Sequence, residues 1–249
     1  MLSEKFKKNL SPQNTEERYS YLPDGTSFVF PECSSLRTIY FPLCGIDAHG
    51  IKSSISPCLA GDIKIDKNQY LTKPVSVEGL RQGLRNFFCY IDGRGVFSLT
   101  DGKQEEATVE AGILWHKLNR THEGAGLAME ALNFVPVTGD HVELMRVTIK
   151  NISKENWVVT PTFSLPLFAR ALSNHHDHEQ VTSLLHRIEQ LPQGVCVQPT
   201  MIFDERGHQP AKSVYYVFGA DGNGSNPTGT FPTTETFYSD KGDMRIPEA

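Results

Sequence analysis

The chain has 249 residues, of which 39% are hydrophobic and 21% are charged, and its formal net charge is −5. This length and composition are ordinary for a globular protein and are enough to bury a substantial core, in one large or two small domains. The net charge is negative and basic residues are not in excess, so we expect that nucleic acid is not a partner.

The spacing of the cysteines and the composition of the first ten residues bear on the cellular compartment of the protein. The five cysteines are widely spaced and include no Cys-x-x-Cys pair, which argues against a zinc ribbon, a redox motif or a complete disulfide framework. The first ten residues lack the apolar region of a signal peptide, and no apolar run is long enough to span a bilayer. We therefore predict a cytoplasmic protein with reduced cysteines and no membrane contact.

Taken in order, the chain reads as a polar segment followed by many short strands. Residues 1–17 are polar, and we expect them to be disordered or extended. Residues 51–66 suit short strands or extended loops, and Asp92-Gly93 and 136–140 are expected hairpin turns. Alternating or β-rich patterns predict strands at 26–30, 36–41, 87–91, 95–99, 107–111, 113–118, 127–135, 145–149, 157–160, 194–197, 200–203 and 213–218.

Strands this short and this frequent predict a sandwich or barrel, and no helix of three turns is expected. The fold class we predict is all-β: a large antiparallel β-sandwich (supersandwich) with few or no long helices. Residues 18–249 are expected to form this single domain. Because the tail from 219 onwards is loop-like and lacks a finishing strand, we expect the sandwich to be truncated at its C-terminal end.

The segment 163–188 is the first functional candidate. Its alternation predicts a strand with Phe163 facing the core, and the apolar run 181–188 predicts a second strand. Between them, residues 170–180 form a polar loop rich in histidine, which is costly to bury. Loops of this kind on a rigid sheet are frequent binding sites.

Many short blocks, in one order, resemble the N-terminal region of the cellobiose phosphorylase family, which are inverting glycoside phosphorylases of glycoside hydrolase family 94. The resemblance covers about residue 21 to the C-terminus. The blocks lie at residues 40–43, 52–57, 61–64, 74–78, 85–87, 110–117, 134–140, 142–146, 181–187 and 203–208.

The resemblance implies a β-sandwich that precedes an (α/α)6 barrel. In that family the barrel carries the catalytic aspartate, the phosphate site and most sugar contacts, and inorganic phosphate is the co-substrate. A carboxylic acid protonates the glycosidic oxygen while phosphate attacks the anomeric carbon from the opposite face. This chain resembles roughly the first quarter to third of such an enzyme, judged by the usual size of one domain. We therefore expect no catalytic residue and no cofactor in it, and no activity from the chain alone.

The expected role is structural: packing on the catalytic barrel domain or subunit, forming a homodimer and lending the central loop to the rim of an oligosaccharide site. Relatives tend to have an arginine where this chain has His176, which weakens the case for an anion or sugar contact at that point. The residues we expect at a substrate site or domain interface are Arg170, Asn174, Asp177, His178 and Arg187.

The sequence is also compatible with other functions. A stand-alone carbohydrate-binding module would need exposed aromatic residues on one sheet face, although we expect core or inter-sheet packing for Trp115 and Trp157. A small metal-dependent enzyme would use the histidine-rich loop, but its spacing fits no standard ligand motif, so we expect no metal. A nonfunctional truncated product would show an open sheet edge and aggregate.

Overall fold

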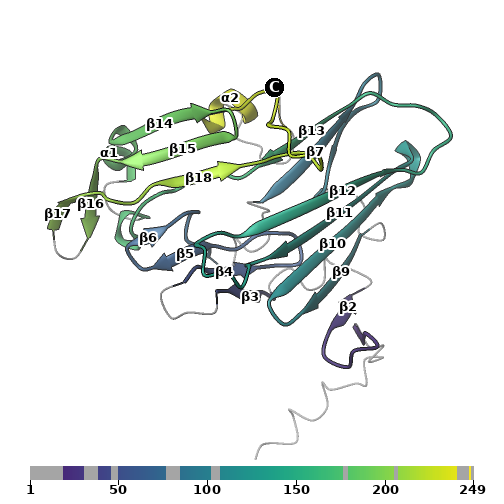
Figure 1. Cartoon of the computed structure of the whole chain (residues 1–249), viewed down its shortest axis with the longest axis horizontal. Coiled ribbons are helices and arrows are strands. Elements are labelled where there is room, and N and C mark those ends of the chain that lie inside the picture. Colours follow the sequence, from purple (N-terminus) through teal and green to yellow (C-terminus); the bar gives the residue numbers. More distant parts are fainter. Residues whose placement is uncertain are drawn as a thin grey trace, which may run out of the picture.

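The computed structural model describes residues 19–30, 39–45, 50–76, 85–101, 107–175, 179–204, 207–239 and 247. In these ranges the chain consists mainly of antiparallel strands in five sheets (Figure 1). The α-helices described are short, α1 at Glu179–Leu184 and α2 at Thr234–Tyr238. Neither has the length and apolar character needed to cross a membrane. The predicted all-β, sandwich-like fold is confirmed, while the predicted N-terminal segment 1–17 lies outside the described residues.

The largest sheet has six strands in the order β1-β2-β9-β10-β11-β12. Their bounds are Ser20–Tyr21 (β1), Phe28–Phe30 (β2), Ala107–Gly112 (β9), Trp115–His122 (β10), Leu127–Phe134 (β11) and Leu144–Asn151 (β12). Along β11, buried and half-buried residues alternate at all eight positions. Leu127, the first residue, faces the core, and Phe134, the last, faces outward. The sequence pattern predicts this alternation, which gives the sheet one core face and one outer face.

Two further sheets face or adjoin the core. One has the order β3-β4-β5-β6, and the other has the order β13-β7-β8. Their bounds are Phe41–Cys44 (β3), Lys52–Ile55 (β4), Ile63–Asp66 (β5), Gln69–Tyr70 (β6), Asn86–Ile91 (β7), Gly95–Ser98 (β8) and Val159–Ser164 (β13). The expected hairpin of β7 and β8 forms, and Gly93 in its turn has a φ of 70°, which glycine adopts at little cost.

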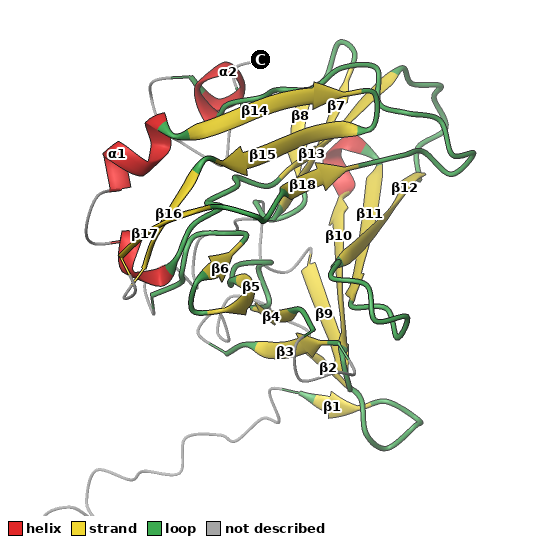
Figure 2. Cartoon of the chain, turned by 60° about the vertical axis from the view of Figure 1, so that its left-hand side comes forward, coloured by secondary structure: helices red, strands yellow, loops and turns green. Residues whose placement is uncertain are grey.

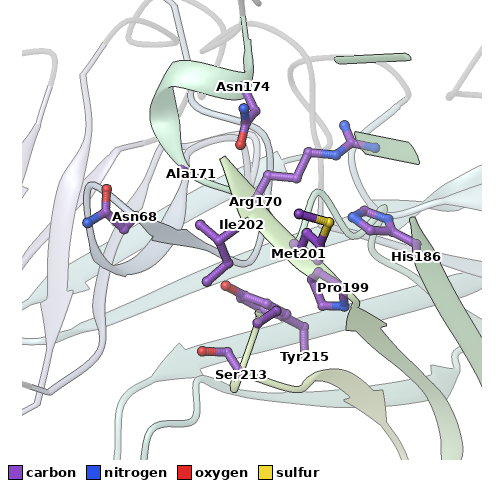
Figure 3. A pocket seen from close by; sticks show the side chains of 12 residues that line it. Asn68, Arg170, Ala171, Asn174, His186, Pro199, Met201, Ile202, Ser213 and Tyr215 are labelled. Carbon is purple, nitrogen blue, oxygen red and sulfur yellow. The ribbon is translucent and has the colours of Figure 1, made fainter. Parts of the chain in front are cut away.

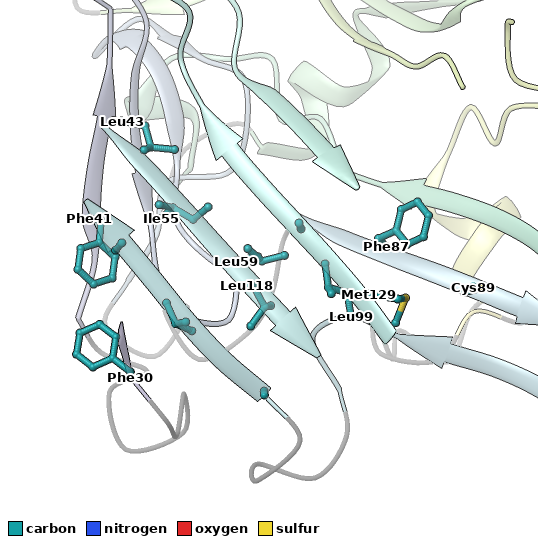
Figure 4. Close-up of a cluster of buried hydrophobic side chains, with 14 of the residues drawn as sticks. Phe30, Phe41, Leu43, Ile55, Leu59, Phe87, Cys89, Leu99, Leu118 and Met129 are labelled. Atoms are coloured by element: carbon teal, nitrogen blue, oxygen red, sulfur yellow. The ribbon is translucent and has the colours of Figure 1, made fainter. Parts of the chain in front are cut away.

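The main core lies between the six-stranded sheet and the β3-β4-β5-β6 sheet (Figure 4). Leu118 of β10 and Met129 of β11 are buried there with Leu43, Ile55 and Leu59 from the other side. Each such side chain contributes roughly 1.5–3 kcal/mol when it is removed from water. This core is what holds the two sheets face to face.

The remaining strands form a lobe on one side of the molecule (Figure 1). It contains the β14-β15-β18 sheet and the β16-β17 hairpin. Their bounds are His186–Leu191 (β14), Gly194–Pro199 (β15), Met201–Asp204 (β16), Gly207–Pro210 (β17) and Tyr215–Phe218 (β18). Short 3-10 turns, η4 (Glu123–Ala125) and η5 (Leu172–His175), complete the described elements.

The C-terminal tail, expected to be loop-like, contains the packed helix α2. The Thr233 side chain caps the helix in a capping box. Phe237 and Tyr238 are buried against Phe88 of β7, with ring centroids 5.6 and 6.3 Å from that ring. The Tyr238 hydroxyl also lies 2.5 Å from the hydroxyl of Ser164, which ties the tail to β13.

The predicted second strand of the central segment is only partly correct. Its first half is helix α1, where Val181 is 51% and Leu184 is 85% exposed. The strand β14 begins at His186. The phase of the preceding strand is also wrong, because Phe163 is 37% exposed whereas Ser164 is buried. The run 181–188 is thus a short helix followed by a strand. The strand at Phe163 has its alternation in the opposite phase from the one expected.

Candidate functional site

Two of the expected site residues, Arg170 and Asn174, lie on the segment that joins β13 to α1. Tyr70 of β6 donates its N–H to the Arg170 carbonyl at 2.9 Å, and Arg170 donates back to the Tyr70 carbonyl at 3.2 Å. Ala169, just before, is buried with a φ of 52°, a conformation that an alanine adopts only where its surroundings hold it. The turn η5 then buries the Asn174 side chain.

Arg170 and Asn174 line one small pocket between this segment and the β14-β15-β18 lobe (Figure 3). The pocket has room for about one water molecule. Among the described residues that line it there is no aspartate or glutamate, so this lining offers hydrogen-bond donors and one cation without a carboxylate. Other residues that line it are Asn68, His186, Met201, Ile202, Ser213 and Tyr215.

The contacts of the Arg170 guanidinium group include Phe168 and Ser183. Its central carbon lies 4.9 Å from the centroid of the Phe168 ring, which is a cation–π distance. One of its terminal nitrogens donates to the hydroxyl of Ser183 on α1. These contacts place the positive charge at the pocket beside α1, with a defined orientation.

His186, the first residue of β14, faces the same pocket. Burial, with a smaller contribution from the positive charge of Arg170, lowers the pKa of His186 to about 4, although a backbone hydrogen bond with Ala169 acts in the opposite direction. Its Nε2 is buried and has no hydrogen-bond partner among the described residues. At neutral pH the ring is therefore uncharged, and Arg170 supplies the charge of the pocket.

Tyr215 of β18 lines the pocket. No pattern in the sequence distinguishes it from its neighbour Tyr216. It is 8% exposed, and burial raises its pKa to about 12. Alternation along β18 places Tyr216 on the opposite face of the sheet. The hydroxyl of Tyr215 thus stays protonated and acts only as a hydrogen-bonding group near neutral pH.

The other expected site residues do not join this pocket. Asp177 and His178 lie outside the described residues. Arg187 is exposed on β14, opposite Gln198 of β15, and it follows the pocket residue His186 directly. Because adjacent strand residues point to opposite faces, Arg187 belongs to the outer face of that sheet.

A metal site in the central loop finds no support in the part of the chain that is described. There, no three His, Cys, Asp or Glu side chains gather closely enough to hold an ion. Of the candidate ligands, His175 packs edge-on against Phe168, with ring centroids 6.2 Å apart, and His186 lines the pocket. His176 and His178 fall outside the described ranges.

The two tryptophans behave differently from each other. Trp157 packs against the main core as expected, with the Arg94 guanidinium 5.4 Å from its ring. Trp115, also expected in the core, is half-buried on the outer face of the six-stranded sheet, opposite Phe134. Core packing is therefore confirmed for Trp157 and wrong for Trp115.

Comparison of the sequence with protein-family models and with curated proteins finds no match. Function is therefore inferred from the residues and their arrangement. The central loop contributes Arg170 and Asn174 to a pocket whose described lining has one cation and no acid. Arg187 lies on the other face of the lobe.

Proposed function

We propose that this chain is an accessory β-sandwich of a glycoside phosphorylase of the cellobiose phosphorylase type, and that it works with an (α/α)6 barrel that carries the catalytic site. The supporting fold is antiparallel and all-β. The observation that carries the proposal is the pocket at Arg170 and Asn174, whose described lining has donors and a cation but no carboxylate. The chain thus supplies binding groups, and the barrel supplies the acid and the phosphate site.

The chemistry of phosphorolysis explains this division. An inverting reaction needs a carboxylic acid on one side of the glycosidic bond and a nucleophile on the other, separated by the sugar ring. The pocket is too small for a sugar ring, and the residues described around it include no acid. Its role is therefore to present Arg170 and Asn174 at the rim of a larger site that closes when the barrel docks.

The outer face of the β14-β15-β18 sheet is the proposed docking surface for the barrel. Tyr216 and Phe218 are 40% and 43% exposed, and their rings stack with centroids 4.7 Å apart. The strand register places Arg187 on the same face, through its partner Gln198. Exposed aromatic residues with an arginine are the composition of an interface centre. We propose that the assembly is a homodimer of such pairs.

Sedimentation of the chain with the separately expressed barrel of a cellobiose phosphorylase tests the docking. We expect a complex, and Tyr216→Asp is expected to weaken it at least about tenfold, because a buried charge without a partner disrupts an apolar contact. Ile113→Asp is the matched control, since Ile113 is 75% exposed in a turn of the six-stranded sheet. Failure of the wild-type chain to bind the barrel, or equal effects of both variants, would count against the docking surface.

A further inference from the structure

The outer face of the six-stranded sheet carries an ordered set of side chains that the proposed function does not use. Figure 2 shows this sheet at the margin of the molecule, with the other described sheets on one side of it. The register aligns outward residues in rows that cross β9, β10, β11 and β12. The row of Gly112, Trp115, Phe134 and Leu144 is apolar, and the next row is Glu110, Lys117, Leu132 and Arg146.

From these rows we infer that the outer face of the six-stranded sheet is a binding platform for an uncharged oligosaccharide. The platform is defined by Trp115, Phe134, Glu110, Lys117 and Asn119. It lies on another sheet than the pocket at Arg170, so it is a second site that does not depend on the proposed phosphorylase role.

The aromatic part of the platform is Trp115 with Phe134 opposite it. A Cβ added to Gly112 would lie 2.3 Å from Nε1 of Trp115 and 2.6 Å from its Cε2, so the indole is laid across the glycine of the neighbouring strand. Glycine at this position makes room for the ring. Trp115 is half-buried, and it lies on the face away from the core. A broad aromatic surface on a sheet suits the apolar face of a pyranose ring.

The polar part of the platform lies in the adjacent rows. Lys117 Nζ and Glu110 Oε2 are 2.7 Å apart, and their side chains are 24% and 22% exposed. Asn119 Nδ2 donates to the other oxygen of Glu110 at 3.2 Å. The ammonium, carboxylate and amide groups are thus ordered by one another and keep further donors and acceptors for hydroxyl groups.

Charge and extent decide what kind of ligand fits. On this face Glu110 and Glu130 oppose Lys117, Arg146 and Lys150, so the mixed charges leave a net of only one positive charge, a weak attraction for an anionic polymer. A row across four strands spans about 14 Å at the usual spacing of 4.8 Å between neighbours. An uncharged oligosaccharide, which combines apolar ring faces with many hydroxyl groups, matches both the aromatic row and the mixed polar row.

The test uses the chain alone with cellohexaose, laminarihexaose and maltohexaose as probes. The chain has two tryptophans, so a ¹⁵N-labelled sample gives two indole N–H signals. We expect at least one of the three hexasaccharides to shift the Trp115 signal, and the core Trp157 signal to stay in place. Absence of any shift at millimolar sugar, or equal shifts at both indoles, would overturn the inference.

Variants locate the binding. Trp115→Ala is expected to weaken the affinity at least about tenfold, and Trp115→Phe is expected to restore part of it because a ring remains. The control is Tyr90→Ala, an exposed aromatic on β7 of the β13-β7-β8 sheet, which should bind sugar as the wild type does. Equal loss in Trp115→Ala and Tyr90→Ala would contradict a platform at Trp115. No barrel is present, so failure here leaves the proposed docking to the barrel unaffected.

Discussion

Arg85 and Glu143 form a buried ion pair between segments 58 residues apart in the sequence. Arg85 donates from Nε to Glu143 Oε1 at 2.6 Å and from one terminal nitrogen to Oε2 at 3.0 Å, and the side chains are only 1% and 6% exposed. Arg85 also donates to the hydroxyl of Ser53 at 2.8 Å and to the Gly61 carbonyl at 3.2 Å. The guanidinium thus joins the start of β7, the β4–β5 turn and the segment before β12.

Removing one partner of this pair is expected to be strongly destabilising. Glu143→Gln leaves the Arg85 charge buried with a weaker acceptor, and we expect a loss of about 3–5 kcal/mol in the free energy of unfolding. Urea unfolding followed by circular dichroism measures it. Glu155→Gln is the control, because Glu155 pairs with Arg94 at the surface and its side chain is 71% exposed; a change of about 1 kcal/mol or less is expected there. Equal losses in the two variants would be inconsistent with the buried pair.

His116 predicts how stability depends on pH. The ring is completely buried, and burial, with a smaller contribution from the charge of Arg85, lowers its pKa to about 3. The unfolded chain takes up a proton at His116 below about pH 6.5 while the folded chain does not. Stability must therefore fall as the pH drops from about 6.5 toward 3, by about 1.4 kcal/mol per pH unit for this one group.

Replacing the ring isolates this effect. In His116→Gln the fall in the free energy of unfolding between pH 7 and 5 should be shallower than in the wild type, whatever its absolute stability. Measuring the slopes of the wild type and of His116→Gln by urea unfolding checks the prediction, and a wild-type slope in His116→Gln would contradict it.

Gly194 at the start of β15 allows the close approach of β18. Its φ is 152°, and an added Cβ would lie 2.1 Å from the carbonyl oxygen of Val217. Gly194→Ala must separate the two strands, and we expect a loss of at least about 3 kcal/mol, greater than ordinary backbone strain of 1–3 kcal/mol.

A second glycine provides the comparison. Gly93 also has a positive φ, of 70°, but nothing lies within 4 Å of an added Cβ. Gly93→Ala should therefore cost only about 1 kcal/mol, the strain of a left-handed alanine. Thermal unfolding of both variants separates steric contact from strain, and similar melting temperatures would show that β18 can shift without penalty.

The charge of Arg170 is expected to affect the pKa of the His186 ring. Its charge is one cause of the low pKa of His186, and burial is the larger one. In Arg170→Ala the pKa of His186 should rise above its value of about 4 and remain below 6.5, because the ring stays buried. Arg187→Ala, next to His186 but on the other face of β14, should change the titration less. Proton NMR of the His186 ring measures both, and an unchanged pKa in Arg170→Ala would show that the two groups do not interact.

The parts of the fold that sequence could predict are those with strict alternation and good turn residues. The strands around Val109, Leu127 and Met145, and the turn at Asp92, follow directly from a period of two and from turn chemistry. These segments have a single buried face, so one pattern specifies both their structure and their orientation.

The segments that were predicted wrongly are those whose structure depends on contacts with other parts of the chain. An apolar run such as 181–188 does not separate a short helix from a strand, and here the helix α1 leaves Leu184 85% exposed. The outward position of Trp115 depends on Gly112 in the neighbouring strand. Such cross-strand relationships exist only once the register is known.

The candidate site was predictable in part for the same reason. A polar loop between apolar runs indicated Arg170 and Asn174, because backbone and side-chain groups of this kind favour the surface. Tyr215 of β18 and Ser213, just before that strand, reach the pocket from more than 35 residues further along the chain, so no local pattern connects them with Arg170. Strand alternation places Arg187 on the opposite face of β14 from the pocket at Arg170, a separation that appears only once the strand is known.

The most direct test of the central claim is an assay of phosphorolysis with inorganic phosphate and a panel of β-linked disaccharides. The chain alone, and the chain with the separately expressed barrel, are compared for release of sugar 1-phosphate and, in reverse, of inorganic phosphate. The accessory role predicts no turnover by the chain alone, and activity or an altered choice of acceptor when the chain is added to the barrel. Turnover by the chain alone would contradict the account and reveal a catalytic site within the sandwich.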